Sequence, residues 1–303
     1  MNPFRLDDDK AYRQWRDHKL ADRPASVEEI TVPIFDAGSL TAGERDAILS
    51  RCRLANAAVY QINGRPVADK GALVALGQQF GLCHLDNNLR SDEDCITSLR
   101  VTPRGEHKEY IPYTSGRMNW HTDGYYNRLD QLVRSFIIHC VSSAQTGGEN
   151  RFMDHEIAYI LLRDEEPAYI AALMEPDVMT IPENIHQGAE IRPAQSGPVF
   201  SVHPVTGTLY MRYTARTRSI VWKQDSVTQE AVACLSGIIS PGSPYVYEHR
   251  LQPGQGIISN NVLHCRGSFT DDADTGRKRH LYRARYWDRI RGTEYCDMFQ
   301  EVA

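Results

Sequence analysis

The chain has 303 residues, of which 41% are hydrophobic and 24% charged, and its formal net charge at pH 7 is -5. This composition is typical of a folded protein with room for a large core. Because 34 basic residues stand against 39 acidic ones, the surface has no positive surplus to attract phosphate backbones, and nucleic acid is not an expected partner.

The cysteines and the hydropathy pattern indicate a cellular location. Seven cysteines are scattered without a C-x-x-C pair, which favours a reduced, cytoplasmic protein. The first thirty residues are charged throughout and lack the apolar run of a secretory signal. No segment approaches the roughly 18 uncharged apolar residues of a membrane span, so we expect no membrane association.

Two helices in the first half are predicted from their ends. Residues 41–52, "TAGERDAILSRC", place Thr41 at the N-cap and Glu44 three residues later, which is a capping box. Residues 68–81, "ADKGALVALGQQFG", carry apolar residues at helical spacing and finish on Gly81, which suits the left-handed position after a helix.

Two later helices and several strands follow. Residues 154–164 would begin from Asp154 as the N-cap, and residues 226–239 would begin from Ser226 with Gln229 three residues on. Strands are predicted from runs of branched and aromatic residues at 30–35, 58–64, 133–141, 197–203, 208–214, 254–261 and 281–288.

The order of these elements predicts one mixed α+β domain over residues 1–303. No repeat, low-complexity tract or Gly/Ser linker divides the chain. Helices are concentrated in an N-terminal part, about residues 1–110, and a mainly antiparallel sheet system fills a core of about residues 111–290.

Three H-x-[D/E] triplets are candidates for half of a metal site. They lie at residues 84–86, 107–109 and 121–123. About one such triplet is expected by chance with 11 histidines, so each taken alone is more simply a surface or turn feature. On an extended strand, however, His121 and Asp123 would point to the same face and could hold one ion.

A third ligand is available at His264, which follows the predicted strand 254–261 in what we expect to be a loop. Two imidazoles and one carboxylate on one face of an octahedral ion leave three open positions, the arrangement of non-haem Fe(II) oxygenases. A zinc hydrolase could use the same three ligands with a bound water, and the residues alone leave that alternative open.

A row of arginines follows His264. On an extended strand Arg279, Arg283 and Arg285 share one face, which an apolar core would accept only together with anions. A 2-oxo diacid that chelates the iron would need such a buried cation for its far carboxylate. This row would have no purpose in a zinc hydrolase.

Taken together, these motifs resemble the taurine dioxygenase-like (TauD/TfdA) family of Fe(II)/2-oxoglutarate oxygenases. Trp120 and the H-x-D triplet give the family's "WHTD" pattern, and residues 146–150, "TGGEN", resemble its "GGDT" turn at the family interval. His264 and residues 277–287, "RKRHLYRARYW", complete the likeness, which spans roughly residues 60–290. The other two triplets have nothing after them at these intervals.

The resemblance implies a fold and a reaction. The fold would be a double-stranded β-helix, a jelly-roll-like, cupin-type barrel of two facing sheets with flanking helices and a lid-like insert. His121, Asp123 and His264 would hold Fe(II), with 2-oxoglutarate and O2 as co-substrates. The enzyme would hydroxylate an unactivated C–H bond of a small molecule and release succinate and CO2.

The resemblance also assigns residues to 2-oxoglutarate. Asn150 stands where the family has a hydroxyl residue, and its amide can still donate to a carboxylate. Arg277 fits the family interval from His264 by count, whereas Arg279 fits better by its strand context, and we predict Arg279 as the anchor of the distal carboxylate. Arg283 matches a family arginine near the substrate or the iron-bound end.

The substrate is predicted less directly. Asp86 would meet a cationic or hydroxyl group and Arg283 an anionic one, so a zwitterion such as an amino acid derivative would satisfy both. The full set of predicted substrate contacts is Asp86, Asn88, Arg117, Gly124, Tyr125 and Arg283. Alternatives are a family member that cleaves sulfonates or sulfate esters and a ligand-binding pseudoenzyme, and a homo-oligomer is compatible with the sequence.

Overall fold

The computed structural model describes residues 2–67, 69–87, 94–101, 111–186, 189–217, 220–272 and 278–295. Asn88 and Arg277 therefore lie outside the described residues. The helices are α1 (Asp9–Ala21), α2 (Ala42–Ala55), α3 (Lys70–Gln78), α4 (His155–Glu165), α5 (Pro167–Leu173) and α6 (Ser226–Ile238). Short 3-10 turns occupy Glu28–Ile30, Ile111–Tyr113 and Leu129–Gln131.

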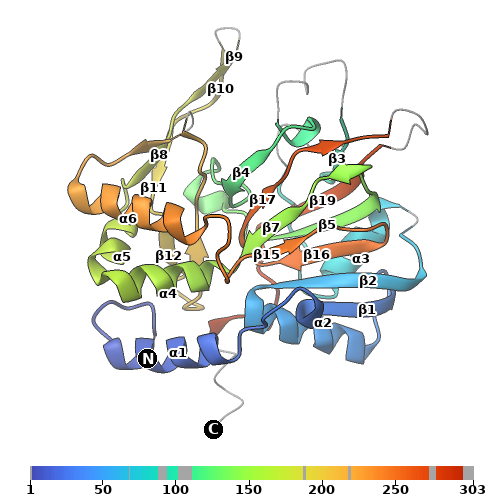
Figure 1. The fold of residues 1–303 in the computed structure, drawn as a ribbon, viewed down its shortest axis with the longest axis horizontal. Coiled ribbons are helices and arrows are strands. Elements are labelled where there is room, and N and C mark those ends of the chain that lie inside the picture. The colour runs from blue at the N-terminus through green and yellow to red at the C-terminus, as the bar shows by residue number, and fades with distance from the viewer. Residues whose placement is uncertain are drawn as a thin grey trace.

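Two sheets form the centre of the molecule (Figure 1). The larger has the order β1 (Thr31–Asp36), β2 (Ala57–Arg65), β16 (Gln255–Ser259), β5 (Ser135–Ser142), β19 (His280–Tyr286) and β3 (Thr97–Leu99). The smaller has the order β15 (Tyr247–His249), β7 (Asn150–Met153), β17 (Leu263–Arg266) and β4 (Met118–His121). Every pair is antiparallel except β1 with β2, so the predicted mainly antiparallel system is confirmed.

Shorter pairs surround these sheets. Strand β8 (Met179–Ile181) pairs with β11 (Gln195–Gly197) and β14 (Val221–Trp222), and β9 (Asn184–His186) pairs with β10 (Ala189–Arg192) in a hairpin that projects from the body (Figure 1). The remaining pairs are β12 (Phe200–Val202) with β13 (Leu209–Met211), and β6 (Thr146–Gly147) with β18 (Phe269–Thr270).

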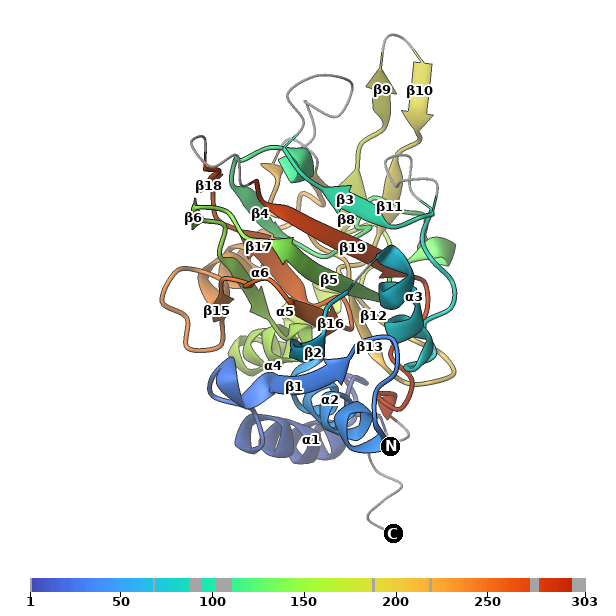
Figure 2. The ribbon, with the colours of Figure 1, turned by 90° about the vertical axis from the view of Figure 1, so that its right-hand side faces the viewer.

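Alternating side chains explain the layers. In β2, Ala58 and Tyr60 pack with α2 and α3, whereas Ala57 and Val59 pack between the two sheets. Figure 2 shows the sheets as facing layers with α3 on the outer side of the larger one. Helices α4, α5 and α6 form a second core with β8, β12 and β13. The two sheets face one another, as expected for a double-stranded β-helix, but within the described residues their strands do not close into a continuous barrel.

Most predicted elements are present, with three differences. The capping box of Thr41 and Glu44 is confirmed, and Asp154 caps α4 as predicted. Helix α6 is capped by Asp225, which accepts from the Thr228 N–H, rather than by Ser226. Helices α1 and α5 were not predicted. Among the described residues, the N-terminal part carries α1, α2 and α3 together with the predicted strands β1 and β2, and the other helices lie after residue 150.

Two observations bear on the location expectations. Among the residues that the structure describes, no helix is long and apolar enough to cross a membrane. Six described cysteines are free thiols: Cys52, Cys83, Cys95, Cys140, Cys234 and Cys265.

Candidate active site

Three of the predicted residues converge between the facing sheets. His121 is the last residue of β4, Asp123 lies in the turn that follows it, and His264 lies on β17. His264 pairs directly with His121 across the two strands, and their ring centroids are 4.3 Å apart. One ligand atom from each of the three residues lies within 4.8 Å of the others. The strand position of His264 corrects the expectation of a loop.

Both imidazoles are oriented for metal binding. The Nδ1 atom of His121 lies 2.9 Å from the Asn119 carbonyl, and that of His264 lies 2.9 Å from the Val262 carbonyl. A carbonyl can only accept, so each Nδ1 carries the proton and each Nε2 keeps a free lone pair. Burial, followed by the neighbouring His264, lowers the pKa of His121 to about 3. Burial likewise lowers the pKa of His264. Both rings are therefore neutral ligands at pH 7.

Asp123 supplies the carboxylate. Its Oδ1 lies 3.1 Å from Nη1 of Arg283 and 3.9 Å from Nη1 of Arg285, while its buried Oδ2 has no hydrogen-bond partner. Burial alone would raise the pKa of Asp123, but Arg283 and Arg285 outweigh it and hold that pKa below its usual range. An ionised oxygen without a donor is costly in an interior. A divalent cation beside the two Nε2 atoms would satisfy it, so these residues fit an Fe(II) ion.

A neighbouring asparagine fixes the turn that carries Asp123. The Asn261 side chain accepts from the Asp123 N–H at 2.8 Å and donates to the Asp123 carbonyl at 3.0 Å. It also donates to the Val133 carbonyl at 2.6 Å, and its own φ is 54°, a conformation that Asn tolerates. Gly124 follows with φ +68°, where a Cβ would meet Val133 at 2.5 Å. The turn is therefore positioned by groups on both sides.

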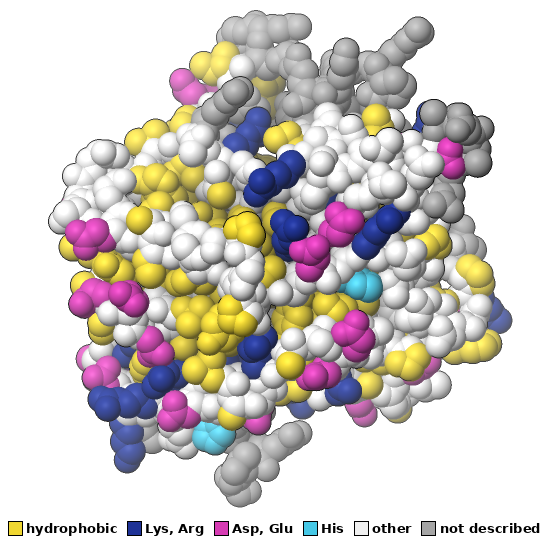
Figure 3. Space-filling model, in the orientation of Figure 1, with side chains coloured by type: hydrophobic (Ala, Val, Ile, Leu, Met, Phe, Trp, Pro, Cys, Tyr) yellow, Lys and Arg dark blue, Asp and Glu magenta, His cyan; other side chains and the backbone are white. Residues whose placement is uncertain are grey.

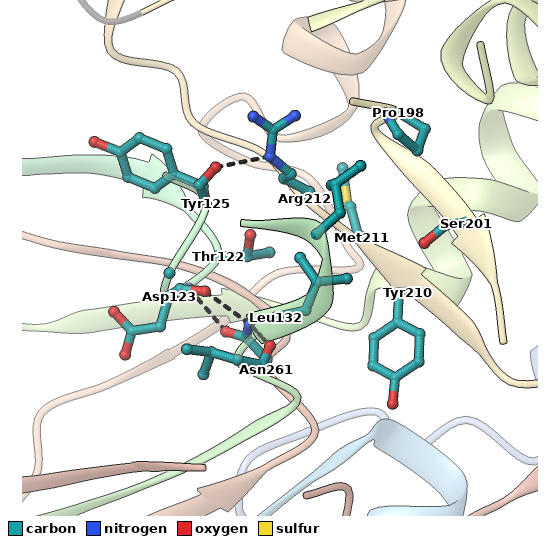
Figure 4. A pocket seen from close by; sticks show the side chains of 13 residues that line it. Thr122, Asp123, Tyr125, Leu132, Pro198, Ser201, Tyr210, Met211, Arg212 and Asn261 are labelled. Carbon is teal, nitrogen blue, oxygen red and sulfur yellow. Dashed lines mark hydrogen bonds between the residues drawn. The ribbon is translucent and has the colours of Figure 1, made fainter. Parts of the chain in front are cut away.

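A small pocket lies behind this turn and is separate from the ligand side. Figure 4 shows the Asp123 carboxylate directed away from the pocket, which is lined by Met211 and Tyr210 from β13 and its neighbours. Arg212 borders it, but its guanidinium donates to the carbonyls of Tyr125, Met179, Gly197 and Gln195. Arg212 therefore ties loops together, and its donors are occupied.

Asp86 and Arg285 form a buried ion pair beside the ligands. The Asp86 carboxylate accepts from Arg285, from Nε1 of Trp287 at 3.2 Å and from the Asn127 amide at 3.1 Å. Arg285 also donates to the Tyr126 hydroxyl at 3.1 Å. With three donors already bound, Asp86 is not the free acceptor that we expected for a cationic group of the substrate. Its carboxylate instead fixes Arg285 next to Asp123.

A second cationic region lies farther along β17 and β19. Arg279 is buried, and its guanidinium lies 5.0 Å from the centroid of the Phe269 ring. A Cβ on Gly148, whose φ is +80°, would come to 3.5 Å from the Arg279 Nε, so the "TGGEN" turn packs closely against this side chain. Within the described residues, Arg279 forms no ion pair. The predicted anchor for a carboxylate is thus a buried cation outside any ion pair, although the Asp271 carboxylate accepts from its main-chain N–H at 2.8 Å.

The other predicted contacts divide between the site and the outside. The Tyr125 ring lies edge-on to His121 at 6.4 Å, which places it beside the candidate metal ligands. Arg117 is exposed and its charge acts on Cys265, which points to the opposite face of β17 from His264, so it is not brought to the site. Asn261 was missed by the sequence analysis, although an Asn after a strand is the type of residue that adopts positive φ.

Comparison with known proteins identifies the family to which the chain belongs. The family described as "Taurine catabolism dioxygenase TauD, TfdA family" matches residues 22–285. A "Uridine-5'-phosphate dioxygenase" of Amycolatopsis sp is 27% identical over 195 residues, which are 63% of this chain and 67% of that protein.

Two solved structures share the fold at lower identity. One is non-heme iron oxygenase OrfP in complex with Fe, succinate and (3S)-hydroxy-L-Arg, with a TM-score of 0.60, 17% identity and 82% of each chain covered. The other is an asparagine oxygenase in complex with Fe(II), 2S,3S-3-hydroxyasparagine and succinate. It has a TM-score of 0.57 and 17% identity, and the alignment covers 85% of this chain and 93% of that chain.

Proposed function

Because this chain belongs to the TauD/TfdA family and is an Fe(II)/2-oxoglutarate-dependent dioxygenase, we propose how its own residues carry that reaction. His121, Asp123 and His264 hold Fe(II), and Arg279 with Asn150 holds the distal carboxylate of 2-oxoglutarate. The observation that carries this proposal is the buried Asp123 carboxylate, whose Oδ2 has no hydrogen-bond partner and which offers an oxygen within 4.8 Å of ring nitrogens of His121 and His264.

The residues around the ligands prepare the site rather than react. Iron with 2-oxoglutarate and O2 supplies the oxidising chemistry that replaces C–H by C–OH, with release of succinate and CO2. Arg283 and Arg285 keep Asp123 ionised and occupy its Oδ1, so that Oδ2 is the oxygen left for the metal. The Asn119 and Val262 carbonyls keep the two imidazoles in the tautomer that binds a metal.

The substrate is a small molecule with an anionic group. Near the ligands, the charge of the exposed Arg216 acts on the Tyr125 hydroxyl, and the guanidinium of Arg192 lies 6.0 Å from the Tyr126 ring centroid. Neither Arg192 nor Arg216 forms an ion pair within the described residues. Figure 3 shows basic side chains in the upper middle of the face, below atoms drawn in grey. Cations beside aromatic rings suit an anion on an unsaturated or cyclic body.

These cations favour a phosphate ester over the zwitterion that we first expected. The curated relative is described as acting on uridine 5'-phosphate. An amino-acid-like substrate, as in the two structural neighbours, would need an acceptor for its ammonium group, and Asp86 is already occupied. We therefore place nucleoside monophosphates first and amino acid derivatives second.

Hydroxylation beside an ester oxygen would also explain the cleavage alternative. A C–OH formed on the carbon that bears the ester oxygen collapses to a carbonyl and expels sulfate or phosphate, and a C–OH formed on the carbon that bears a sulfonate sulfur collapses to a carbonyl and expels sulfite. The test of function is therefore substrate-stimulated succinate formation across nucleoside monophosphates, amino acids and sulfonates, with inorganic phosphate and sulfite measured in parallel. Stimulation by amino acids and not by phosphates would reverse our order. A substrate response without succinate would support the hydrolase or the pseudoenzyme.

Three broader features complete the proposal. Residues 1–303 act as one catalytic domain, in which the hairpin of β9 and β10 serves as the lid-like insert. The free thiols are compatible with a cytoplasmic location. Size measurement in solution would decide whether the chain forms a homo-oligomer.

A further inference from the structure

Two buried guanidinium groups, those of Arg266 and Arg279, lie at the distal end of the site, by which we mean the end proposed to hold the distal carboxylate of 2-oxoglutarate. Arg266 and Arg279 both contact Phe269, at 4.9 and 5.0 Å from the ring centroid to the guanidinium carbon. Both residues are at most 5% exposed. Within the described residues, neither side chain has a carboxylate partner. The Arg279 guanidinium packs on the Phe269 ring, and the Asp271 carboxylate accepts from the Arg279 main-chain N–H at 2.8 Å, whereas Arg266 bonds only to main-chain carbonyls.

The position of Arg266 follows from the strand that carries it. Arg266 lies two residues after the ligand His264 on β17, so both side chains project from the same face. In the ladder of β17 with β7, Arg266 pairs with Asn150. The β7 residue Asn150 is the one predicted to help hold 2-oxoglutarate. Strand register therefore brings Arg266 to the same end of the site as Asn150.

Burying two like charges together is unfavourable unless an anion joins them. Both guanidinium groups carry a positive charge, and both are buried against the same Phe269 ring. A buried charge that lacks its partner strongly destabilises a fold. The fold therefore keeps two cations where the apolar alternative would be more stable, which points to a ligand that neutralises them.

The guanidinium of Arg266 is oriented and still has donors to offer. Its Nη2 donates to the carbonyls of Thr114, at 3.0 Å, and of Gly116. Its Nε is buried and has no acceptor. Main-chain carbonyls fix the plane of the guanidinium but carry no net negative charge. The positive charge of Arg266 is therefore not neutralised by these contacts.

We propose that Arg266 and Arg279 together form a two-guanidinium clamp for the distal carboxylate of 2-oxoglutarate. This inference rests on the proposed function and adds Arg266 as a specificity-determining residue for the co-substrate. The clamp has one more positive charge than a carboxylate neutralises. A 2-oxo acid that ends in a dianionic phosphonate is therefore expected to bind more tightly than 2-oxoglutarate itself.

The experiment compares a 2-oxo acid that has a distal carboxylate with one that lacks it. Anaerobic Fe(II) protein is titrated with 2-oxoglutarate or with 2-oxopentanoate, and binding is read from the visible charge-transfer band. For Arg266→Gln we expect the Kd of 2-oxoglutarate to rise at least about tenfold, the loss of one charge-assisted contact. The Kd of 2-oxopentanoate should stay unchanged, because it cannot reach the clamp.

The control and the contrary outcomes separate this inference from the function. Arg151, adjacent to Asn150 on β7, pairs with Glu248 on the outer face, and Arg151→Gln should leave both Kd values unchanged. Equal weakening of both acids by Arg266→Gln, or of neither, would overturn the clamp. If Arg266→Gln does not fold, phosphonate binding to the unaltered protein decides: weaker binding than 2-oxoglutarate would overturn it. Absence of any band with either acid would instead contradict the proposed function.

Discussion

The two ends of the site differ in how their charges are balanced. At the metal end, Asp123 with Arg283 and Asp86 with Arg285 form a closed set of paired charges. At the distal end, Arg266 and Arg279 are buried, and neither guanidinium forms an ion pair with a described residue. At the metal end the charged side chains are paired before any ligand binds, and only one carboxylate oxygen and two ring nitrogens lack a partner. The second end is complete only with an anion. The metal end therefore positions the metal ligands, and the distal end selects the co-substrate.

The largest expected effect is the loss of a metal ligand. Asp123→Ala or His264→Ala should weaken Fe(II) binding by more than about a hundredfold and abolish succinate formation, since changes to groups that only orient ligands already cost 10- to 100-fold. Anaerobic equilibrium dialysis measures the affinity. His84→Ala is the matched control, because His84 heads another H-x-D triplet but is exposed and paired with Asp288. Equal loss in all three variants would contradict the assignment.

Breaking the paired charges should cost stability more than affinity. Asp86→Asn removes the nearer of the two carboxylates beside the buried Arg285 and leaves only Asp123, at 3.9 Å, so we expect the free energy of unfolding of the apoprotein to fall by about 3 kcal/mol. Urea unfolding followed by Trp287 fluorescence measures it, since Nε1 of Trp287 bonds to Asp86. If stability were unchanged while the KM of the substrate rose, Asp86 would be a substrate contact, as the sequence first suggested.

Removing a cation from the distal end should lower the affinity for 2-oxoglutarate without lowering the stability of the protein. Arg279→Met removes a charge that has no internal partner, so the apoprotein should be at least as stable as before. The Kd of 2-oxoglutarate should rise by roughly thirtyfold or more, about 2 kcal/mol. Titration of the charge-transfer band and urea unfolding test the two halves. Arg117→Met, on the outer surface, is the control, and equal 2-oxoglutarate affinity in the two variants would sink the prediction.

A smaller effect is expected from pH. Burial holds the pKa of His121 at about 3 and that of His139 at about 4, below the 6.5 of an unperturbed histidine. Between those values the unfolded chain binds more protons than the folded one, so stability falls as pH falls below 6.5. Each such histidine contributes a slope of at most about 1.4 kcal/mol per pH unit. Urea midpoints of the apoprotein at pH 7, 6 and 5 measure the slope, and a flat profile would contradict it.

The sequence predicted the metal ligands but not the residues that surround them, and the reason is physical. The three ligands and Arg279 follow from motifs with fixed intervals and from strand alternation. Arg266, Asn261 and the pairing of Asp86 with Arg285 depend on which strands face one another. That arrangement is set by register and not by local pattern. The missed helices α1 and α5 have the same cause, because packing against α4 and α6 stabilises them.

The central claim is that His121, Asp123 and His264 hold one Fe(II) ion beside a cationic site for a 2-oxo diacid. Anaerobic addition of 2-oxoglutarate to the Fe(II)-loaded protein tests it most directly. We expect a visible charge-transfer band that saturates at one equivalent of each and is absent from His264→Ala. A protein that binds Fe(II) tightly but develops no band, or a band that survives in His264→Ala, would contradict the account.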